Sequence, residues 1–133
     1  CDLRIADDTA RFGVPIAKLG FPMAPGELAA LLRVVDQGTA AELLLEARLF
    51  DATGALQRGL VQRVVAPAAL MHEIEATLTR ICALPRDVAR RNKRTLRQLQ
   101  RGGLTQAERA AHFDYAAADD HRNGIAAFLT SRT

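Results

Sequence analysis

The sequence has no tryptophan, one tyrosine and two cysteines among its 133 residues. Two cysteines are too few for a disulfide framework, which predicts a reducing, cytoplasmic location. Arg33 interrupts the longest apolar stretch, so no run approaches the roughly 20 residues that span a bilayer, and we expect no membrane partner. The three histidines, His72, His112 and His121, lie far apart without metal-ligand spacing, which predicts that the chain holds no metal.

Motifs of several common reaction centres are also missing. The chain has no Gly-x-Ser-x-Gly elbow, no phosphate-binding Gly-x-x-x-x-Gly-Lys loop and no histidine pattern beside either cysteine. The carboxylate pairs at 7–8 and 119–120 are poor candidates for paired acid and base. Adjacent residues on a strand point to opposite faces, and acids at the start of a helix are more often caps.

Alanine and arginine are abundant instead. The 25 alanines favour packed helices over a β-sandwich, and the length suffices for one core. The net charge is +3, and segment 86–101 carries seven basic residues against a single acid, Asp87. Such a segment can bind nucleic acid, but it lacks interleaved aromatic residues, so we expect a solvated face and no nucleic-acid partner. Acidic side chains of a neighbouring subunit, or the phosphates of a nucleotide tail, remain alternatives for some of these arginines.

The first half of the chain mixes strand and helix patterns. Short strands are expected at 1–6 and 12–16, and a leucine stripe predicts a helix over 26–35. The Thr39-x-x-Glu42 pattern predicts a capping box that opens a second helix. Asp51 is expected to cap a short helix that Gly59 ends, before a strand at 60–65.

From Pro67 onward the patterns are helical only. An apolar stripe predicts a helix over 67–84, which Pro85 ends, and a basic helix follows over 86–101. Thr105-x-x-Glu108 predicts a second capping box, and Asp119 or Asp120 is expected to cap the last helix. We therefore expect a division into an α/β part, 1–66, and an all-helical part, 67–133.

One stretch, 10–26, has the character of a lined site. Gly13 allows the backbone to approach another group closely, and Pro15 fixes its own φ. Between Phe12 and Gly26 the only ionisable side chain is Lys18, so the lining is mostly apolar. From these residues alone, the stretch can also be explained as a buried strand and its turn, with no binding role.

Four segments match, in order, motifs of the enoyl-CoA hydratase/isomerase (crotonase) family, and together they cover nearly the whole chain. They are 1–15, with its Phe-Gly-Val-Pro turn, 41–52, 55–65 and 119–128. The chain thus resembles the C-terminal half of a crotonase subunit. The resemblance implies an α/β fold, in which 1–66 ends a crotonase-like (ββα) spiral core and 67–133 forms a helical trimerisation region. It also implies a homotrimer or a hexamer.

The resemblance has direct consequences for chemistry. In this family, two backbone N–H groups hold the enolate oxygen of an acyl-CoA thioester, and one or two carboxylates move protons. Both donors and the first glutamate of the hydratases would lie upstream of Cys1. The second glutamate would follow the turn proline, where this chain has Ile16, so we expect no catalytic residue in this chain and poor simple hydration.

The resemblance also assigns binding residues. The acyl-pocket lining would be Phe12, Gly13, Pro15, Ile16, Leu19 and Phe21. At the other end of the substrate, Phe128 would contact the adenine of coenzyme A, and Arg132 would replace a lysine of some members.

The expected function is that of an acyl-CoA lyase or isomerase in fatty acid metabolism, with a coenzyme A thioester as substrate and no cofactor. A decarboxylase or hydrolase that uses only the oxyanion hole and upstream acids is a rival. From another class, a non-catalytic acyl-CoA-binding or scaffold protein is the alternative. The chain by itself is expected to be inactive and prone to aggregation because its strands have unpaired edges.

Overall fold

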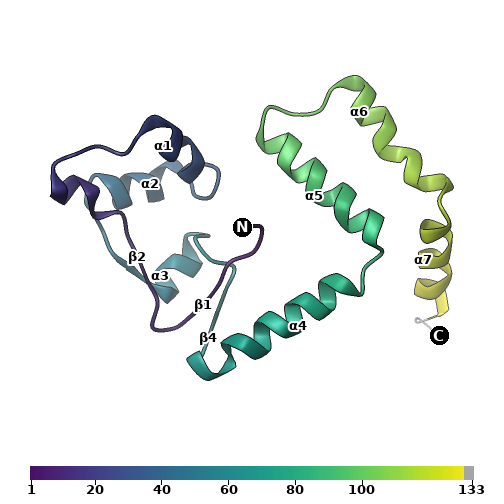
Figure 1. The fold of residues 1–133 in the computed structure, drawn as a ribbon, viewed down its shortest axis with the longest axis horizontal. Coiled ribbons are helices and arrows are strands. Elements are labelled where there is room, and N and C mark those ends of the chain that lie inside the picture. Colours follow the sequence, from purple (N-terminus) through teal and green to yellow (C-terminus); the bar gives the residue numbers. More distant parts are fainter. Residues whose placement is uncertain (131–133) are drawn as a thin grey trace. The chain divides into compact units, whose positions relative to one another are not determined.

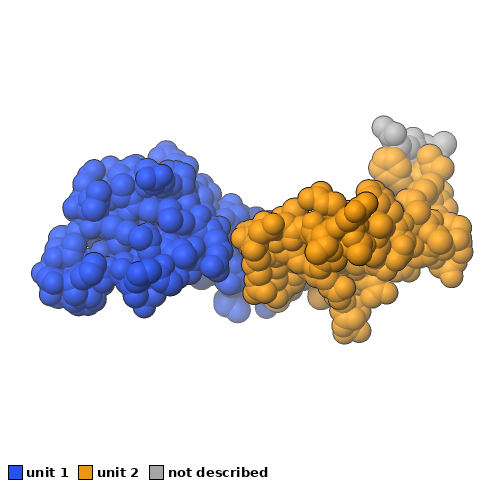
Figure 2. All heavy atoms as spheres, turned by 90° about the horizontal axis from the view of Figure 1, so that it is seen from above, with its two compact units in different colours: residues 1–77 blue, residues 78–133 orange. Residues whose placement is uncertain are grey.

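The computed structural model describes residues 1–130 and shows a mixed α/β chain that is rich in helices (Figure 1). The chain divides into two compact units, 1–77 and 78–133, and the boundary falls inside helix α4 (Leu70–Cys82) (Figure 2). These units are defined by internal contacts, whereas the boundary expected at residue 66 separates a spiral core from a trimerisation region. That expected boundary stays a prediction.

The first unit contains two small sheets. Strand β1 (Ile5–Asp7) pairs in parallel with β4 (Arg63–Val65), and β2 (Arg11–Phe12) pairs antiparallel with β3 (Phe50–Asp51). The turn after β1 is closed by the Asp7 carboxylate, which accepts hydrogen bonds from the side chain and the backbone N–H of Thr9. These bonds lower the pKa of Asp7 because they stabilise its ionised form.

The strand expected over 12–16 is wrong beyond Phe12. Pro15 opens a 3₁₀ helix instead, η1 (Pro15–Leu19). Proline suits a first helical position because its fixed φ is helical and no hydrogen bond is expected of its missing N–H. The strand expected over 60–65 is also shorter, since β4 begins at Arg63.

Three helices complete this unit: α1 (Pro25–Leu31), α2 (Gln37–Leu44) and α3 (Ala52–Gln57). The capping box expected to open a helix at Thr39 is wrong, because Asp36 caps α2 and accepts from the Thr39 N–H at 2.9 Å. Thr39 therefore lies inside the first turn. The expected partner, Glu42, instead pairs with Arg48 at 2.5 Å and Arg58 at 3.0 Å.

The short helix α3 agrees with the sequence. The Asp51 carboxylate accepts from the Gly54 N–H at 2.7 Å, and Gly59 follows the helix with a positive φ of 72°. A small core forms beside this helix from Ala6, Ala55 and Val61. Because its buried residues are small, this core brings β1, α3 and the chain before β4 close together.

The second unit is helical. After η2 (Pro67–Ala69) and α4, it contains α5 (Arg86–Gln100), α6 (Gln106–Ala111), η3 (His112–Ala117) and α7 (Asp119–Thr130). The capping box at the start of α6 is confirmed, with Thr105 and Glu108 bonded reciprocally. Asp119 and Asp120 lie inside the first turn of α7 rather than before it, where negative charge favours the helix dipole. None of the helices in the described part of the chain is both long and apolar enough to cross a membrane.

Candidate functional site

The predicted acyl-pocket segment begins at a close backbone contact. A Cβ added at Gly13 would lie 2.9 Å from Leu49 Cδ1 and 3.3 Å from the carbonyl oxygen of Arg48. Real Cβ atoms essentially never lie so near another atom, so the close approach expected of Gly13 is present. A side chain at this position would have to displace the tip of Leu49 and press on the Arg48 carbonyl, because the chain before η1 runs directly against the residues that lead into β3.

The segment then turns through η1 and ends in a left-handed residue. Gly20 has a φ of 82°, and its N–H donates to the carbonyl of Ala17 at 3.2 Å. The predicted lining residues divide by exposure. Leu19 and Phe21 are 70% and 51% exposed, Gly13 and Pro15 are exposed, and Ile16 is half-buried. Phe12 packs partly against the small core, so its role is at least partly structural.

Acid–base chemistry has no source within this segment. Lys18 is the only ionisable residue between Phe12 and Gly26, and its side chain is exposed at the end of η1. Ile16 lies in η1 immediately after the proline, and its hydrocarbon side chain neither accepts nor donates a proton. The segment can bind an apolar group and exclude water, but it cannot itself transfer a proton.

A charged network supports the start of β3, directly after the residues that face Gly13. Phe50 is 3% exposed, and the guanidinium carbons of Arg58 and Arg48 lie 4.3 Å and 5.4 Å from its ring centroid. Both arginines pair with Glu42, which holds them over the ring. The sequence did not reveal this cluster, because Arg48 and Arg58 lie 6 and 16 residues from Glu42 and only the fold brings them together.

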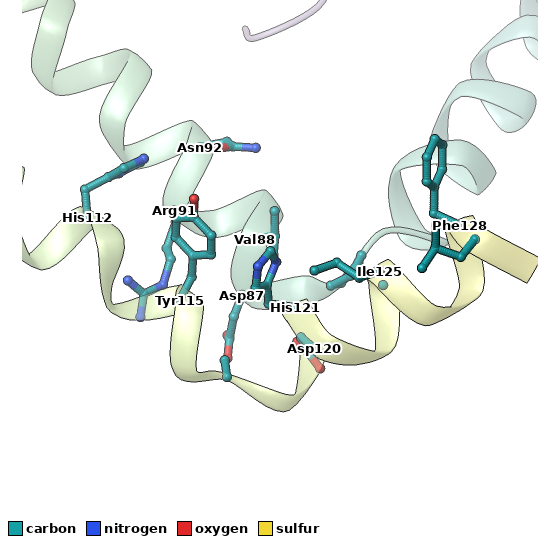
Figure 3. A pocket seen from close by; sticks show the side chains of 14 residues that line it. Asp87, Val88, Arg91, Asn92, His112, Tyr115, Asp120, His121, Ile125 and Phe128 are labelled. Carbon is teal, nitrogen blue, oxygen red and sulfur yellow. The ribbon is translucent and has the colours of Figure 1, made fainter.

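The second unit has a hollow of about 590 Å³ formed by α5, η3 and α7 (Figure 3). Its apolar lining includes Val88, Ile125, Phe128 and Leu129. The predicted adenine contact, Phe128, is 59% exposed and lines this hollow. The other predicted contact to coenzyme A, Arg132, lies outside the described residues.

Three rings of the second unit form a chain of edge contacts. The ring centroids of Tyr115 and His121 lie 5.3 Å apart, and those of His112 and Tyr115 lie 6.3 Å apart, both near perpendicular (Figure 3). His112 Nδ1 lies 3.5 Å from the Thr95 hydroxyl. These contacts join η3 to α5 and α7. Among residues 1–130, no group of three His, Cys, Asp or Glu side chains could hold a metal ion.

Comparison with known proteins defines the class to which this fold and these segments belong. The family model for enoyl-CoA hydratase/isomerase matches residues 1–133. Among solved structures, an enoyl-CoA hydratase/carnithine racemase from Magnetospirillum magneticum superposes with a TM-score of 0.88 at 36% identity, covering 98% of this chain and 49% of that one. The chain belongs to the enoyl-CoA hydratase/isomerase family and has the crotonase fold, as its sequence motifs predicted.

Curated relatives agree with this assignment. A probable enoyl-CoA hydratase of Mycobacterium leprae is 37% identical over 136 residues, which cover 99% of this chain and 52% of the relative. A crotonyl-CoA hydratase of Syntrophomonas wolfei is 33% identical over 138 residues, again covering 99% of this chain and 52% of the relative. The chain thus spans about half the length of the relatives it matches.

Proposed function

We propose that the intact protein is an acyl-CoA enzyme that stabilises a thioester enolate in an oxyanion hole supplied by residues outside this chain. Family membership and relatives named as hydratases support the substrate class. The observation that carries the finer proposal is the absence of any carboxylate from the segment around Ile16. A soluble homotrimer or hexamer in the cytoplasm, with no added cofactor, completes the proposal.

The position of Ile16 bears on which reaction the enzyme catalyses. By resemblance, this residue stands where the hydratases carry their second glutamate. A placed acid or base contributes roughly 10²–10⁴ in rate, or about 3 to 5 kcal/mol. Hydration needs a group that activates water and a source for the α-proton, so it suffers from the loss. Migration of a double bond or decarboxylation needs one acid and is less affected.

The apolar segment suits the acyl chain of such a substrate. Ile16, Leu19 and Phe21 present hydrocarbon surface over η1 and the residues that follow it, beside Gly13 and Pro15. Covering this surface with an acyl chain is favourable by roughly 25 cal/mol for each Å² removed from water. We assign Phe12 to the inner end of the same wall, because it is half-buried against the core.

The coenzyme A end of the substrate is assigned to Phe128. Its partly exposed ring in an apolar hollow can stack on adenine. In the full-length protein, Phe128→Ala should cost about 1 kcal/mol of aromatic contact, which weakens coenzyme A binding roughly five- to tenfold. Phe113→Ala is the matched control, because Phe113 is 64% exposed on η3 and is not among the residues that line the hollow. Unchanged affinity of the Phe128 variant in calorimetry would assign that ring to packing alone.

A second candidate function is favoured by the same Ile16. A family member that has lost proton-transfer groups can still bind acyl-CoA, so the intact protein would be a binder or scaffold. The two candidates differ in turnover while they share the ligand.

Two assays of the full-length protein distinguish these functions. One follows hydration of crotonyl-CoA, and the other follows migration of the double bond in a 3-enoyl-CoA. We expect migration to exceed hydration by about 10² or more, on the scale of one proton-transfer group. Binding of coenzyme A thioesters without turnover would establish the non-catalytic alternative, and efficient hydration would contradict the role given to Ile16.

A further inference from the structure

Helix α5 and its C-terminal residue concentrate the positive charge of the chain. Segment 86–101 contains seven basic residues and one acid, whereas the whole chain has a net charge of only +3. The rest of the chain is therefore net negative. The helix has a single carboxylate, Asp87, which lines the hollow and also lines a second hollow together with Arg94, Glu108 and Asp114.

Six of the seven basic residues share one side of the helix. They recur at intervals of three and four, which places them in a stripe along α5. This stripe, called here the basic face, consists of Arg86, Arg90, Lys93, Arg94, Arg97 and Arg101. The seventh, Arg91, points elsewhere, since it lines the hollow and donates to the carbonyl of Ala111 at 3.5 Å.

Several of these cations have no anionic partner in the part of the chain that the structure describes. Arg86, Arg90, Arg94 and Arg101 are exposed, and none forms an ion pair with any of residues 1–130. The like charges of these four arginines, which lie four or seven residues apart along the helix, repel one another. An anionic partner laid along the row would remove that repulsion.

The length and border of the basic face indicate the kind of partner. Fifteen helical residues extend about 22 Å, which is longer than the phosphates of one nucleotide tail can cover. Leu96, three residues after Lys93 and 64% exposed, adds apolar surface at the edge of the face. Protein interfaces combine arginine with apolar contact, whereas the phosphates of a nucleic-acid backbone offer no apolar surface for Leu96 to contact.

Two other extended anions fit less well. Proteins that bind single-stranded nucleic acid stack its bases on aromatic side chains, and α5 has none. A helix that lies on a membrane buries a broad apolar face, whereas α5 has only two large exposed apolar side chains outside the hollow, Leu96 and Leu99.

We propose that the basic face of α5, with Leu96 at its edge, docks an acidic protein. The partner would present carboxylates at helical spacing beside an apolar side chain. Charge complementarity of this kind speeds encounter and selects the partner, and it makes binding sensitive to salt.

The test measures binding of a labelled helical peptide to the full-length protein by fluorescence anisotropy. The peptide carries glutamates at intervals of three and four with one leucine beside them, and a second peptide has glutamine in their place. We expect the glutamate peptide to bind at least about tenfold more tightly, and its affinity to fall as salt rises. Arg90→Gln combined with Arg94→Gln should weaken it about fivefold or more.

A matched pair of substitutions controls for the change in net charge. Lys18→Gln combined with Arg33→Gln removes two exposed cations from the first unit and should change the affinity less than about twofold. Leu96→Ala should weaken binding of the glutamate peptide without changing the salt dependence of that binding.

Four results would overturn the proposal. The first is equal binding of the two peptides, and the second is loss of binding in both double variants alike. The third is tighter binding of a DNA duplex or of phosphatidylserine vesicles through Arg90 and Arg94. The fourth is a change in the mass of the protein alone on substitution of Arg90 and Arg94, because that would assign the face to a second copy.

Discussion

Gly13 shows how a single missing methyl group shapes the candidate acyl pocket. A Cβ added here would contact the tip of the Leu49 side chain and the carbonyl oxygen of Arg48, so a side chain fits only if these neighbours shift. The contact holds the start of η1 against the residues before β3, where Arg48 and Arg58 both lie against the ring of Phe50. The position of Ile16, three residues further on, therefore depends on this glycine.

We predict that Gly13→Ala destabilises the full-length protein by about 1 to 3 kcal/mol, the usual range for overpacking. Gly26→Ala is the control, because no atom lies within 4 Å of the added Cβ and alanine is the better helix former in α1. Urea denaturation should show a lower midpoint only for the first variant. Equal midpoints would mean that Leu49 moves aside without cost.

At the scale of the element, the sequence predicted best those features that depend on neighbouring residues. The basic helix, the short helix capped by Asp51 and the capping box at Thr105 depend on residues within one turn of one another, so their patterns sufficed. The start of α2 was wrong because two caps compete there. The Asp36 carboxylate accepts the hydrogen bond from the Thr39 N–H, and the Glu42 carboxylate forms ion pairs with Arg48 and Arg58 instead of capping the helix.

Features that join distant parts of the chain could not be predicted, because no local pattern encodes them. The parallel pairing of β1 with β4 joins residues 58 apart in the chain. The hollow depends on how η3 and α7 pack against α5, and no single segment encodes that packing. The family motifs located Ile16 and Phe128 in sequence, whereas only the structure shows that Phe128 lines a hollow.

The cap of α2 predicts a dependence of stability on pH. The backbone N–H and the hydroxyl of Thr39 lower the pKa of Asp36 below its usual 3.8, because both donate to the ionised carboxylate. The stabilisation is thus present above that usual value and is lost as the pH falls through the lower pKa of the folded state.

Asp36→Asn should remove this part of the acid sensitivity, because asparagine can still cap a helix but does not titrate there. The measurement is the urea midpoint of the full-length protein at neutral and at acidic pH. The variant should lose less stability on acidification than the wild type. An identical loss in both proteins would assign the acid sensitivity to other carboxylates, such as Asp7 and Glu108.

At the scale of the whole molecule, we predict assembly into a trimer or a dimer of trimers. Large apolar side chains of the second unit are exposed, among them Leu78, Ile81 and Leu84. Exposed apolar surface of this kind marks contact with another chain more often than it marks free surface. Sedimentation of the full-length protein should give three or six times the subunit mass, and a stable monomer would contradict the prediction.

The central claim is that the intact protein is an acyl-CoA enzyme whose hydration chemistry is limited by Ile16. The most direct measurement is the turnover of crotonyl-CoA hydration by the full-length wild type and by Ile16→Glu, with Ile16→Gln as a polar control that carries no titratable group. We predict weak hydration by the wild type, a gain of about 10² or more in the glutamate variant, and no comparable gain with glutamine. Fast hydration by the wild type, with no gain in Ile16→Glu, would contradict this account.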